Sequence, residues 1–406
     1  MVERYLEILN QINAVYLDLT KKLEKIGKKN FLIVIGLGLI CLLNIFLVHS
    51  VPLYSLYIPS ESKVITDEDL YAWAGWVYVH EGQLATVNPD HPPLAKYLIG
   101  LGITLFGDRM YMSLIFGFGL AIIIYLLGCR AGLPPKIAIT ASIILILDRL
   151  FVRLATTSLL DIFVTFFIYS ATLVFLISLK RAGMFVLYGF VAGLAMACKW
   201  SALFFLLPLS IVGFVKTRSK WLLVGLLLFL GTYLASYTPL FLQGGTLDDF
   251  IKVQIFILEN QQEYRLILRF IPQLQLNFLT GYSINYNILD QFGLFRVVPE
   301  HNPLTWPLMF GSAVLGIVYF FKDRNFARFV FNMMFWCGLI SLFFIQGFIW
   351  YLLPLLPAGL LSLMFIFRAS SNGKGERLKM DVFLVLLILV AFFAPYIPLP
   401  AEYILL

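Results

Sequence analysis

Two short segments near the N-terminus carry side chains capable of acid–base and phosphate chemistry. Residues 66–71 read TDEDLY and place three carboxylates, Asp67, Glu68 and Asp69, side by side. Adjacent carboxylates repel one another and are costly beside a membrane unless they are solvated or used. The segment is therefore either a solvated turn or a functional carboxylate pair at the head of a membrane cavity.

Residues 88–96 read NPDHPPLAK and combine a histidine, a proline pair and a lysine. The prolines favour an extended backbone and remove two hydrogen-bond donors. Lys96 is predicted to begin an apolar interfacial helix, 94–106. Taken alone, the segment is a rigid turn with a snorkelling lysine, and His91 is a loop histidine with satisfied hydrogen bonds. The functional alternative makes Lys96 a cation for a phosphate and His91 a supporting residue.

The elements that must position these residues are membrane-spanning helices. The chain has 406 residues, of which 60% are hydrophobic and 13% charged, and its mean hydropathy is +0.88. Soluble globular domains are nearer half apolar and a quarter charged, which excludes a soluble enzyme and a disordered protein. The net charge of +7 does not cluster on a soluble surface, so no nucleic-acid partner is expected.

We predict an all-α polytopic membrane protein with about 11 transmembrane helices in one domain, 31–398. Apolar runs recur along the chain, and roughly 20 helical residues cross a hydrocarbon core. The predicted spans are 31–48, 110–130, 136–148, 158–179, 184–198, 200–215, 221–238, 304–321, 328–346, 350–367 and 381–398.

The basic residues predict the orientation. With the N-terminus in the cytoplasm, the inner segments hold 20 of the 30 Lys and Arg residues but only 7 of the 23 Asp and Glu residues. Cytoplasmic loops of membrane proteins carry such an excess of Lys and Arg. The N-terminus is therefore predicted to be cytoplasmic and the C-terminus to lie outside.

Three segments are predicted to lie outside the membrane. Residues 1–30 carry heptad-spaced apolar side chains, which predicts a cytoplasmic amphipathic helix on anionic lipids or against a partner. The outer loops 49–109 and 239–303 are long, and such loops are usually functional. We expect the second loop to cover the cavity that contains Asp67, with 282–291 lining an acceptor route. Its amphipathic half, from Leu247 to about Arg269, is expected to turn four side chains towards lipid: Phe250, Ile251, Phe256 and Ile257.

Several motifs, in this order, resemble one known family. An acidic pair after the first span precedes HPPLAK at 91–96, and SLLD stands at 158–161. GLAMACKW follows at 193–200, His301 precedes WPL at 306–308, and YLLPLLP stands at 351–357. The ordered set resembles the dolichyl-phosphate-mannose–protein mannosyltransferases, which have the multispanning GT-C fold. The 239–303 segment is too short for the trefoil domain of the eukaryotic members.

The resemblance implies an inverting glycosyltransferase that moves mannose, or a related sugar, from a polyprenyl or dolichyl phosphate to a Ser or Thr hydroxyl of a protein. Such a step needs a base for the hydroxyl and cations for the departing phosphate. Asp67 is the expected base, and Glu68 would hold the sugar or the acceptor. No cofactor is firmly expected: the polyprenyl- or dolichyl-phosphate sugar is the donor, and a divalent metal at the acidic run is the less favoured alternative.

The candidate cations for the donor phosphate lie at predicted outer helix ends: Lys96, Arg149, Arg153 and Lys199. Lys199 needs a partner because an unpaired cation at membrane depth costs about 2.5–3.5 kcal/mol. The partner is either the phosphate or a carboxylate, Asp148 or Asp161, and Asp161 is alternatively a structural ion pair or helix cap.

His91, Asp161, His301 and Trp306 are the expected supporting residues. Trp200, Trp306 and Trp350 are expected to be interface anchors, with sugar stacking as the alternative.

Two other functions compete with this one. A related transferase would use the same donor but a lipid or cell-wall glycan as acceptor. A transporter would suit intramembrane charge and broken helices. However, the charges gather on one face, and no internal two-fold repeat is seen. We expect an integral protein of a prokaryotic cell membrane or of the endoplasmic reticulum, active on the extracytoplasmic side. Its partners would be the donor, the acceptor and membrane lipids. A second copy of the chain, in a dimer, is a further candidate partner.

Overall fold

The computed structural model describes residues 36–40, 66–263, 283–285, 294–298, 305–323, 325–342, 349–369, 384–389 and 404–405. The helix predicted for 1–30 lies outside the described residues. So do His301 and most of the predicted acceptor route, 282–291.

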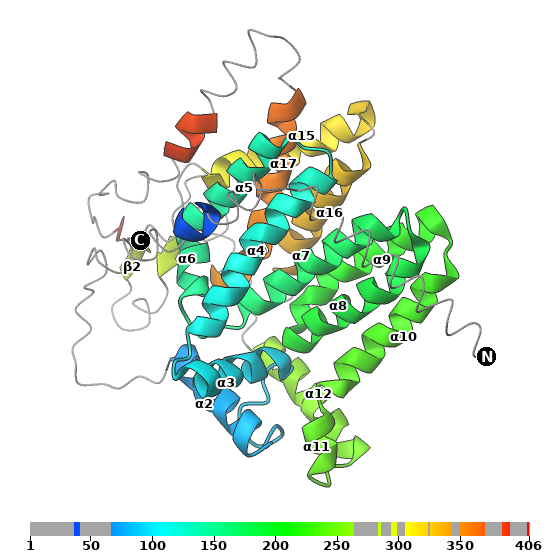
Figure 1. Ribbon diagram of the computed structural model, residues 1–406. Coiled ribbons are helices and arrows are strands. Elements are labelled where there is room, and N and C mark those ends of the chain that lie inside the picture. Colours follow the sequence, from blue (N-terminus) through cyan, green and yellow to red (C-terminus); the bar gives the residue numbers. More distant parts are fainter. Residues whose placement is uncertain are drawn as a thin grey trace.

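The described residues form a helical protein (Figure 1). The helices are α2 (Asp67–His80), α3 (Leu94–Phe106), α4 (Tyr111–Arg130), α5 (Pro135–Leu147), α6 (Arg149–Ala155), α7 (Asp161–Ser178), α8 (Phe185–Cys198), α9 (Leu203–Thr217), α10 (Lys220–Ala235), α11 (Thr238–Leu242), α12 (Leu247–Glu263), α15 (Thr305–Asp323), α16 (Phe326–Ser341) and α17 (Leu355–Ala369). Short 3₁₀ turns are η1 (Ala182–Met184), η2 (Trp200–Ala202) and η4 (Ile349–Leu352).

A small antiparallel sheet departs from the all-α expectation. Its strands are β1 (Ser283–Asn285), β2 (Leu294–Val298) and β3 (Ile404–Leu405), and β2 lies between the other two. The sequence of β2, LFRVV, is rich in residues that favour strands. The expectation of a helical fold is otherwise confirmed.

Three helices are long and apolar enough to cross a membrane: Tyr111–Arg130, Asp161–Ser178 and Trp200–Thr217. Seven shorter apolar helices accompany them in the described chain, among them Pro135–Leu147, Lys220–Ala235 and Leu355–Arg368. Each of these segments overlaps a predicted span, except Leu94–Phe106. The predicted interfacial helix 94–106 is α3, with the same bounds.

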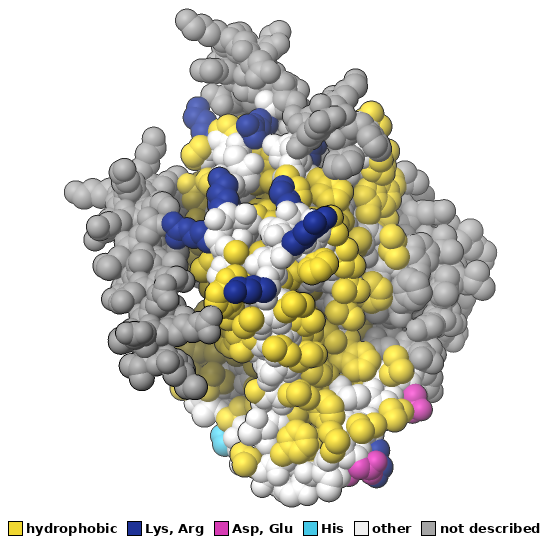
Figure 2. Space-filling model, turned by 90° about the vertical axis from the view of Figure 1, so that its right-hand side faces the viewer, with side chains coloured by type: hydrophobic (Ala, Val, Ile, Leu, Met, Phe, Trp, Pro, Cys, Tyr) yellow, Lys and Arg dark blue, Asp and Glu magenta, His cyan; other side chains and the backbone are white. Residues whose placement is uncertain are grey.

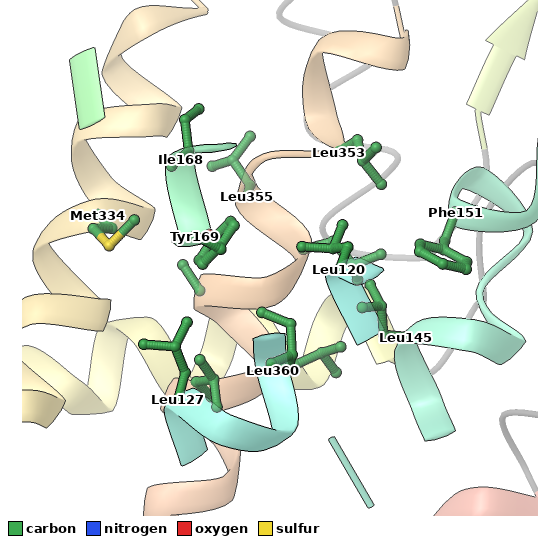
Figure 3. Packing of buried hydrophobic residues seen from close by; sticks show 14 of the residues in the cluster. Leu120, Leu127, Leu145, Phe151, Ile168, Tyr169, Met334, Leu353, Leu355 and Leu360 are labelled. Atoms are coloured by element: carbon green, nitrogen blue, oxygen red, sulfur yellow. The ribbon is translucent and has the colours of Figure 1, made fainter. Parts of the chain in front are cut away.

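The core lies where α4, α5, α7, α16 and α17 meet. Leu120 and Leu127 of α4 and Tyr169 of α7 are buried there beside Met334 of α16 and Leu360 of α17 (Figure 3). Within the apolar core, the hydroxyl of Tyr169 donates a hydrogen bond to the carbonyl of Pro354 at 2.6 Å. This bond matters because a buried hydroxyl is costly without a partner.

Two glycine pairs allow helix backbones to touch. A Cβ on Gly189 of α8 would overlap the carbonyl of Gly225 of α10, so these two helices cross at the closest approach that backbones permit. A Cβ on Gly100 of α3 would likewise overlap the carbonyl of Gly75 of α2. The second crossing builds the α2–α3 hairpin, which lies at the lower end of the molecule in Figure 1, with α11 and α12.

The α12 helix packs against that end through one face. Val253 and Ile257 are buried against Tyr233 and Tyr237, and Phe250 packs against Tyr237 edge to face. Ile251 and Phe256 are exposed. The expectation that Phe250 and Ile257 turn towards lipid is wrong, because the tyrosines at the end of α10 provide an apolar seat for them.

Candidate functional site

The three carboxylates of the acidic run, residues 67–69, have different roles. Thr66 caps α2: its hydroxyl accepts from the amide of Asp69, whose carboxylate accepts from the Thr66 hydroxyl at 2.7 Å. Arg109 donates to the other Asp69 oxygen at 2.5 Å. These bonds, to Arg109 first and then to Thr66, lower the pKa of Asp69 to about 2. Asp69 is therefore a capping residue, which leaves Asp67 and Glu68 for chemistry.

Asp67 and Glu68 are carboxylates with raised pKa values. Burial and the charge of Asp90 raise the pKa of Asp67, and Lys199 acts in the opposite direction. Burial also raises the pKa of Glu68, which Arg153 and Arg109 oppose. A raised pKa makes a carboxylate a stronger base, the property that proton abstraction needs. Ser158 donates to the carbonyl of Glu68 at 2.7 Å and so ties this turn of α2 to the chain before α7.

Lys96 lies fully buried in the α2–α3 hairpin. Its ammonium donates to Asp90 at 2.6 Å and to the carbonyl of Asn88. It also lies 5.5 Å from the centre of the Tyr71 ring and 5.8 Å from that of Tyr78. The snorkelling lysine expected here is wrong: the side chain points into the protein, because a carboxylate and two aromatic rings receive it there.

His91 is buried beside this pair. Its Nε2 atom lies 4.0 Å from an Asp90 oxygen, and its ring centre lies 6.1 Å from that of Tyr71. Burial lowers the pKa of His91 to about 3, with Lys199 and Lys96 acting in the same direction and Asp90 against it. At neutral pH the imidazole is therefore uncharged and does not supply a cation to a phosphate.

Lys199 forms the second buried ion pair. It follows α8, and its ammonium donates to both oxygens of Asp161, at 2.9 and 3.1 Å. The ammonium also lies 3.6 Å from the centre of the Tyr351 ring. Of the two carboxylates considered as partners, Asp161 is the one observed. Whether Lys199 also binds a phosphate stays a prediction.

Asp148 and Trp306 have structural roles at the same end of the bundle. Asp148 caps α6 by accepting from the amides of Leu150 and Phe151, and its other oxygen accepts from the Trp306 indole at 3.1 Å. Trp306 is fully buried, so the interface anchor expected for it is wrong. Arg149 and Arg153 lie on α6, and Arg153 is exposed and interacts with the charge of Glu68.

Two contributors were not expected from the sequence, Asp90 and Tyr71. The Tyr71 hydroxyl donates to Asp90 at 3.4 Å. The position of Tyr71 four residues after Asp67, on one helix face, was the available signal. The pairing of Asp90 with Lys96 was not readable, because Asn88 between α2 and α3 has a left-handed backbone, with φ 47°. In the part of the chain that the structure describes, no three His, Cys, Asp or Glu side chains form a metal-binding group.

Part of the chain is similar to a known protein family. Residues 90–240 match the family model described as dolichyl-phosphate-mannose-protein mannosyltransferase. The matched range includes both buried ion pairs, Asp90–Lys96 and Asp161–Lys199, together with His91.

Residues 90–240 are a dolichyl-phosphate-mannose–protein mannosyltransferase family domain.

The fold around this mannosyltransferase-family domain is shared with two glycosyltransferases of the GT-C class. ArnT from Cupriavidus metallidurans, bound to undecaprenyl phosphate, has a TM-score of 0.57 and 12% identity over 89% of this chain. The apo oligosaccharyltransferase of Archaeoglobus fulgidus has a TM-score of 0.51 and 15% identity over 89% of this chain. The chain spans 64% and 55% of these two structures. No curated protein sequence matches it.

Proposed function

We propose that the protein is an inverting glycosyltransferase that moves mannose, or a related sugar, from a polyprenyl or dolichyl phosphate to a Ser or Thr hydroxyl of a protein. One observation carries the proposal. Asp67, at the start of α2, has a carboxylate with a raised pKa, and the charges of Asp90 and Lys199, which come from distant parts of the chain, act on it. A base and buried charge pairs thus converge at one end of a membrane bundle.

In the proposed reaction, the acceptor hydroxyl oxygen attacks the anomeric carbon of the sugar. Asp67 takes the hydroxyl proton, and the bond from the anomeric carbon to the phosphate oxygen breaks. The lipid phosphate leaves with the electron pair, through a transition state with oxocarbenium character. Glu68, next to Asp67 and close to Arg153, would hold the sugar or the acceptor.

Cations must offset the charge that grows on the departing phosphate. Lys96 and Lys199 each have a carboxylate partner, so each would have to share its ammonium with the phosphate. Arg149 and Arg153 lie on α6, and the charge of Arg153 lowers the pKa of Glu68, which supports Arg153 as a cation for the phosphate. The undecaprenyl phosphate bound to ArnT supports a donor of this lipid class.

The distribution of charge supports an outer location for the site. Lys180 and Arg181 follow α7, and Lys216, Arg218 and Lys220 lie around the turn between α9 and α10, at the helix ends opposite Asp161 and Lys199. Figure 2 shows Lys and Arg at the upper end, an apolar band below them, and Asp and Glu at the lower end. Basic residues favour the cytoplasmic side, which supports an outer position for Asp67.

A lipid or cell-wall glycan remains the alternative acceptor for the same donor chemistry. The likeness to ArnT and the oligosaccharyltransferase rests on fold, which does not choose an acceptor. Incubation of the purified protein with a labelled polyprenyl-phosphate mannose and either Ser/Thr peptides or glycolipids separates the two. Transfer to peptide supports the proposal, whereas transfer to glycolipid alone supports the alternative.

Asp67→Asn tests the base. The amide keeps the size of the side chain but cannot take a proton, and loss of such a base typically lowers the rate by about 10²–10⁴. Donor binding should remain. The wild-type kcat/KM should rise with pH through the pKa of Asp67, which lies above 3.8, because only the ionised form is a base. Asp248→Asn, on the exposed start of α12, is the matched control. Wild-type turnover in folded Asp67→Asn would refute the assignment.

A further inference from the structure

Asp90 joins the two helices of the α2–α3 hairpin to the loop between them. One carboxylate oxygen accepts from the ammonium of Lys96 at 2.6 Å. The other accepts from the hydroxyl of Tyr71 at 3.4 Å and lies 4.0 Å from Nε2 of His91. A carboxylate with this many partners is fixed in orientation rather than available to a ligand.

The backbone beside Asp90 is fixed as well. Asn88 adopts a left-handed conformation, which Asn tolerates better than most residues. Its carbonyl accepts from Lys96 and, at 3.0 Å, from the hydroxyl of Tyr78, which also donates to the carbonyl of Val87 at 2.7 Å. Lys96 therefore holds both the backbone of this turn and the side chain that the turn presents.

The contact between Asp90 and Tyr71 affects Asp67 because Tyr71 and Asp67 lie on the same helix, α2. Tyr71 lies one helical turn after Asp67, on the same face. The charged groups that act on Asp67 from other elements are Asp90 on the loop, Lys199 after α8 and Asp161 on α7, and Glu68 adds its charge from α2 itself. Of these, Asp90 is the carboxylate that also bonds to the helix carrying Asp67.

We propose that Asp90 is a positioning residue for the base of the transferase: Lys96 fixes one of its oxygens, and the other holds Tyr71 and thereby the first turns of α2. Of the two lysines considered above for the donor phosphate, Lys96 therefore pairs with Asp90 alone, which leaves Lys199, Arg149 and Arg153 as the candidate cations. The inference rests on the proposed function, in which Asp67 is the base.

Asp90→Asn removes the charge but keeps an acceptor oxygen for Tyr71. We expect kcat to fall by roughly 10-fold or more, with the KM for the lipid-phosphate sugar unchanged, because a misplaced base affects the chemical step. The acid limb of the pH profile should move down by about 0.5 pH unit, because a neighbouring negative charge no longer opposes ionisation of Asp67. An unmoved acid limb with a wild-type kcat would overturn the proposal.

Lys96→Met tests the assignment of the lysine. A lower kcat with an unchanged donor KM is expected. A higher donor KM with an unchanged kcat would instead place Lys96 on the phosphate and overturn the proposal. Where a single variant fails to fold because it buries one uncompensated charge, the Asp90→Asn/Lys96→Met double variant removes both charges and keeps the test possible.

Hydrogen exchange gives a readout that does not depend on activity. In Asp90→Asn, the amides of residues 67–71 should exchange faster, while those of α4 remain unchanged. Equal exchange in both proteins would refute the positioning role. Faster exchange in a protein whose wild type transfers no lipid-linked sugar would refute the proposed function, while the finding that Asp90 orders the first turns of α2 would stand.

Discussion

Lys199 is the residue at which structural and chemical roles are hardest to separate. Its buried pair with Asp161 explains why a lysine can lie between two apolar helices at all. Buried pairs gain little over apolar substitutes, yet removal of one partner is costly because the other charge stays buried. A single substitution therefore reports mainly on the orphaned carboxylate.

The Lys199→Met and Asp161→Asn variants together separate the two roles. Lys199→Met alone should destabilise the protein by about 3–5 kcal/mol, and the double variant should recover most of that loss. Thermal unfolding in detergent measures the recovery. If Lys199 also contacts the phosphate, the stable double variant will bind the donor weakly and turn over slowly. A double variant with wild-type donor affinity would limit Lys199 to the ion pair.

At the scale of elements, the crossing of α2 and α3 at Gly75 and Gly100 brings Lys96 to Asp90. Gly100→Ala should force the two backbones apart, since its Cβ would overlap the Gly75 carbonyl. We expect a loss of about 1–3 kcal/mol or more, and a fall in activity. Gly231→Ala on α10 is the control, because no neighbouring atom lies within 4 Å of its added Cβ. A neutral Gly100→Ala would contradict this crossing.

Elements with a strong local signal were the ones that the sequence predicted well. The apolar stretch 94–106 follows a proline pair and precedes Gly107, which ends the helix in a left-handed conformation. Its bounds were therefore predictable. Phe250 and Ile257 were assigned to lipid because an amphipathic pattern shows which face is apolar but not what covers it. Asp90 and Tyr71 were missed in the sequence because the turn before α3 brings them together. Trp306 was misassigned because the partner of its indole, Asp148, is distant in sequence.

For the whole molecule, the proposed orientation predicts which end faces the cytoplasm. In intact cells, a cysteine introduced by Asp248→Cys on α12 should react with a membrane-impermeant maleimide, and one introduced by Lys220→Cys at the start of α10 should not. Both positions are on described helices, at opposite ends of the bundle. Because native cysteines contribute background labelling, the wild-type protein is the reference. The reverse labelling pattern would place Asp67 in the cytoplasm.

A relay of hydrogen bonds connects the outer helix to the site. The Trp200 indole, next to Lys199, donates to the Tyr233 hydroxyl at 2.8 Å, and that hydroxyl donates to Gln254 of α12 at 2.5 Å. The Gly189–Gly225 pair keeps the backbones of α8 and α10 in close contact. The turn that carries Lys199 is thus joined to α12 by side-chain hydrogen bonds as well as by the chain. A displacement of α12 is therefore expected to disturb Trp200, the immediate neighbour of Lys199.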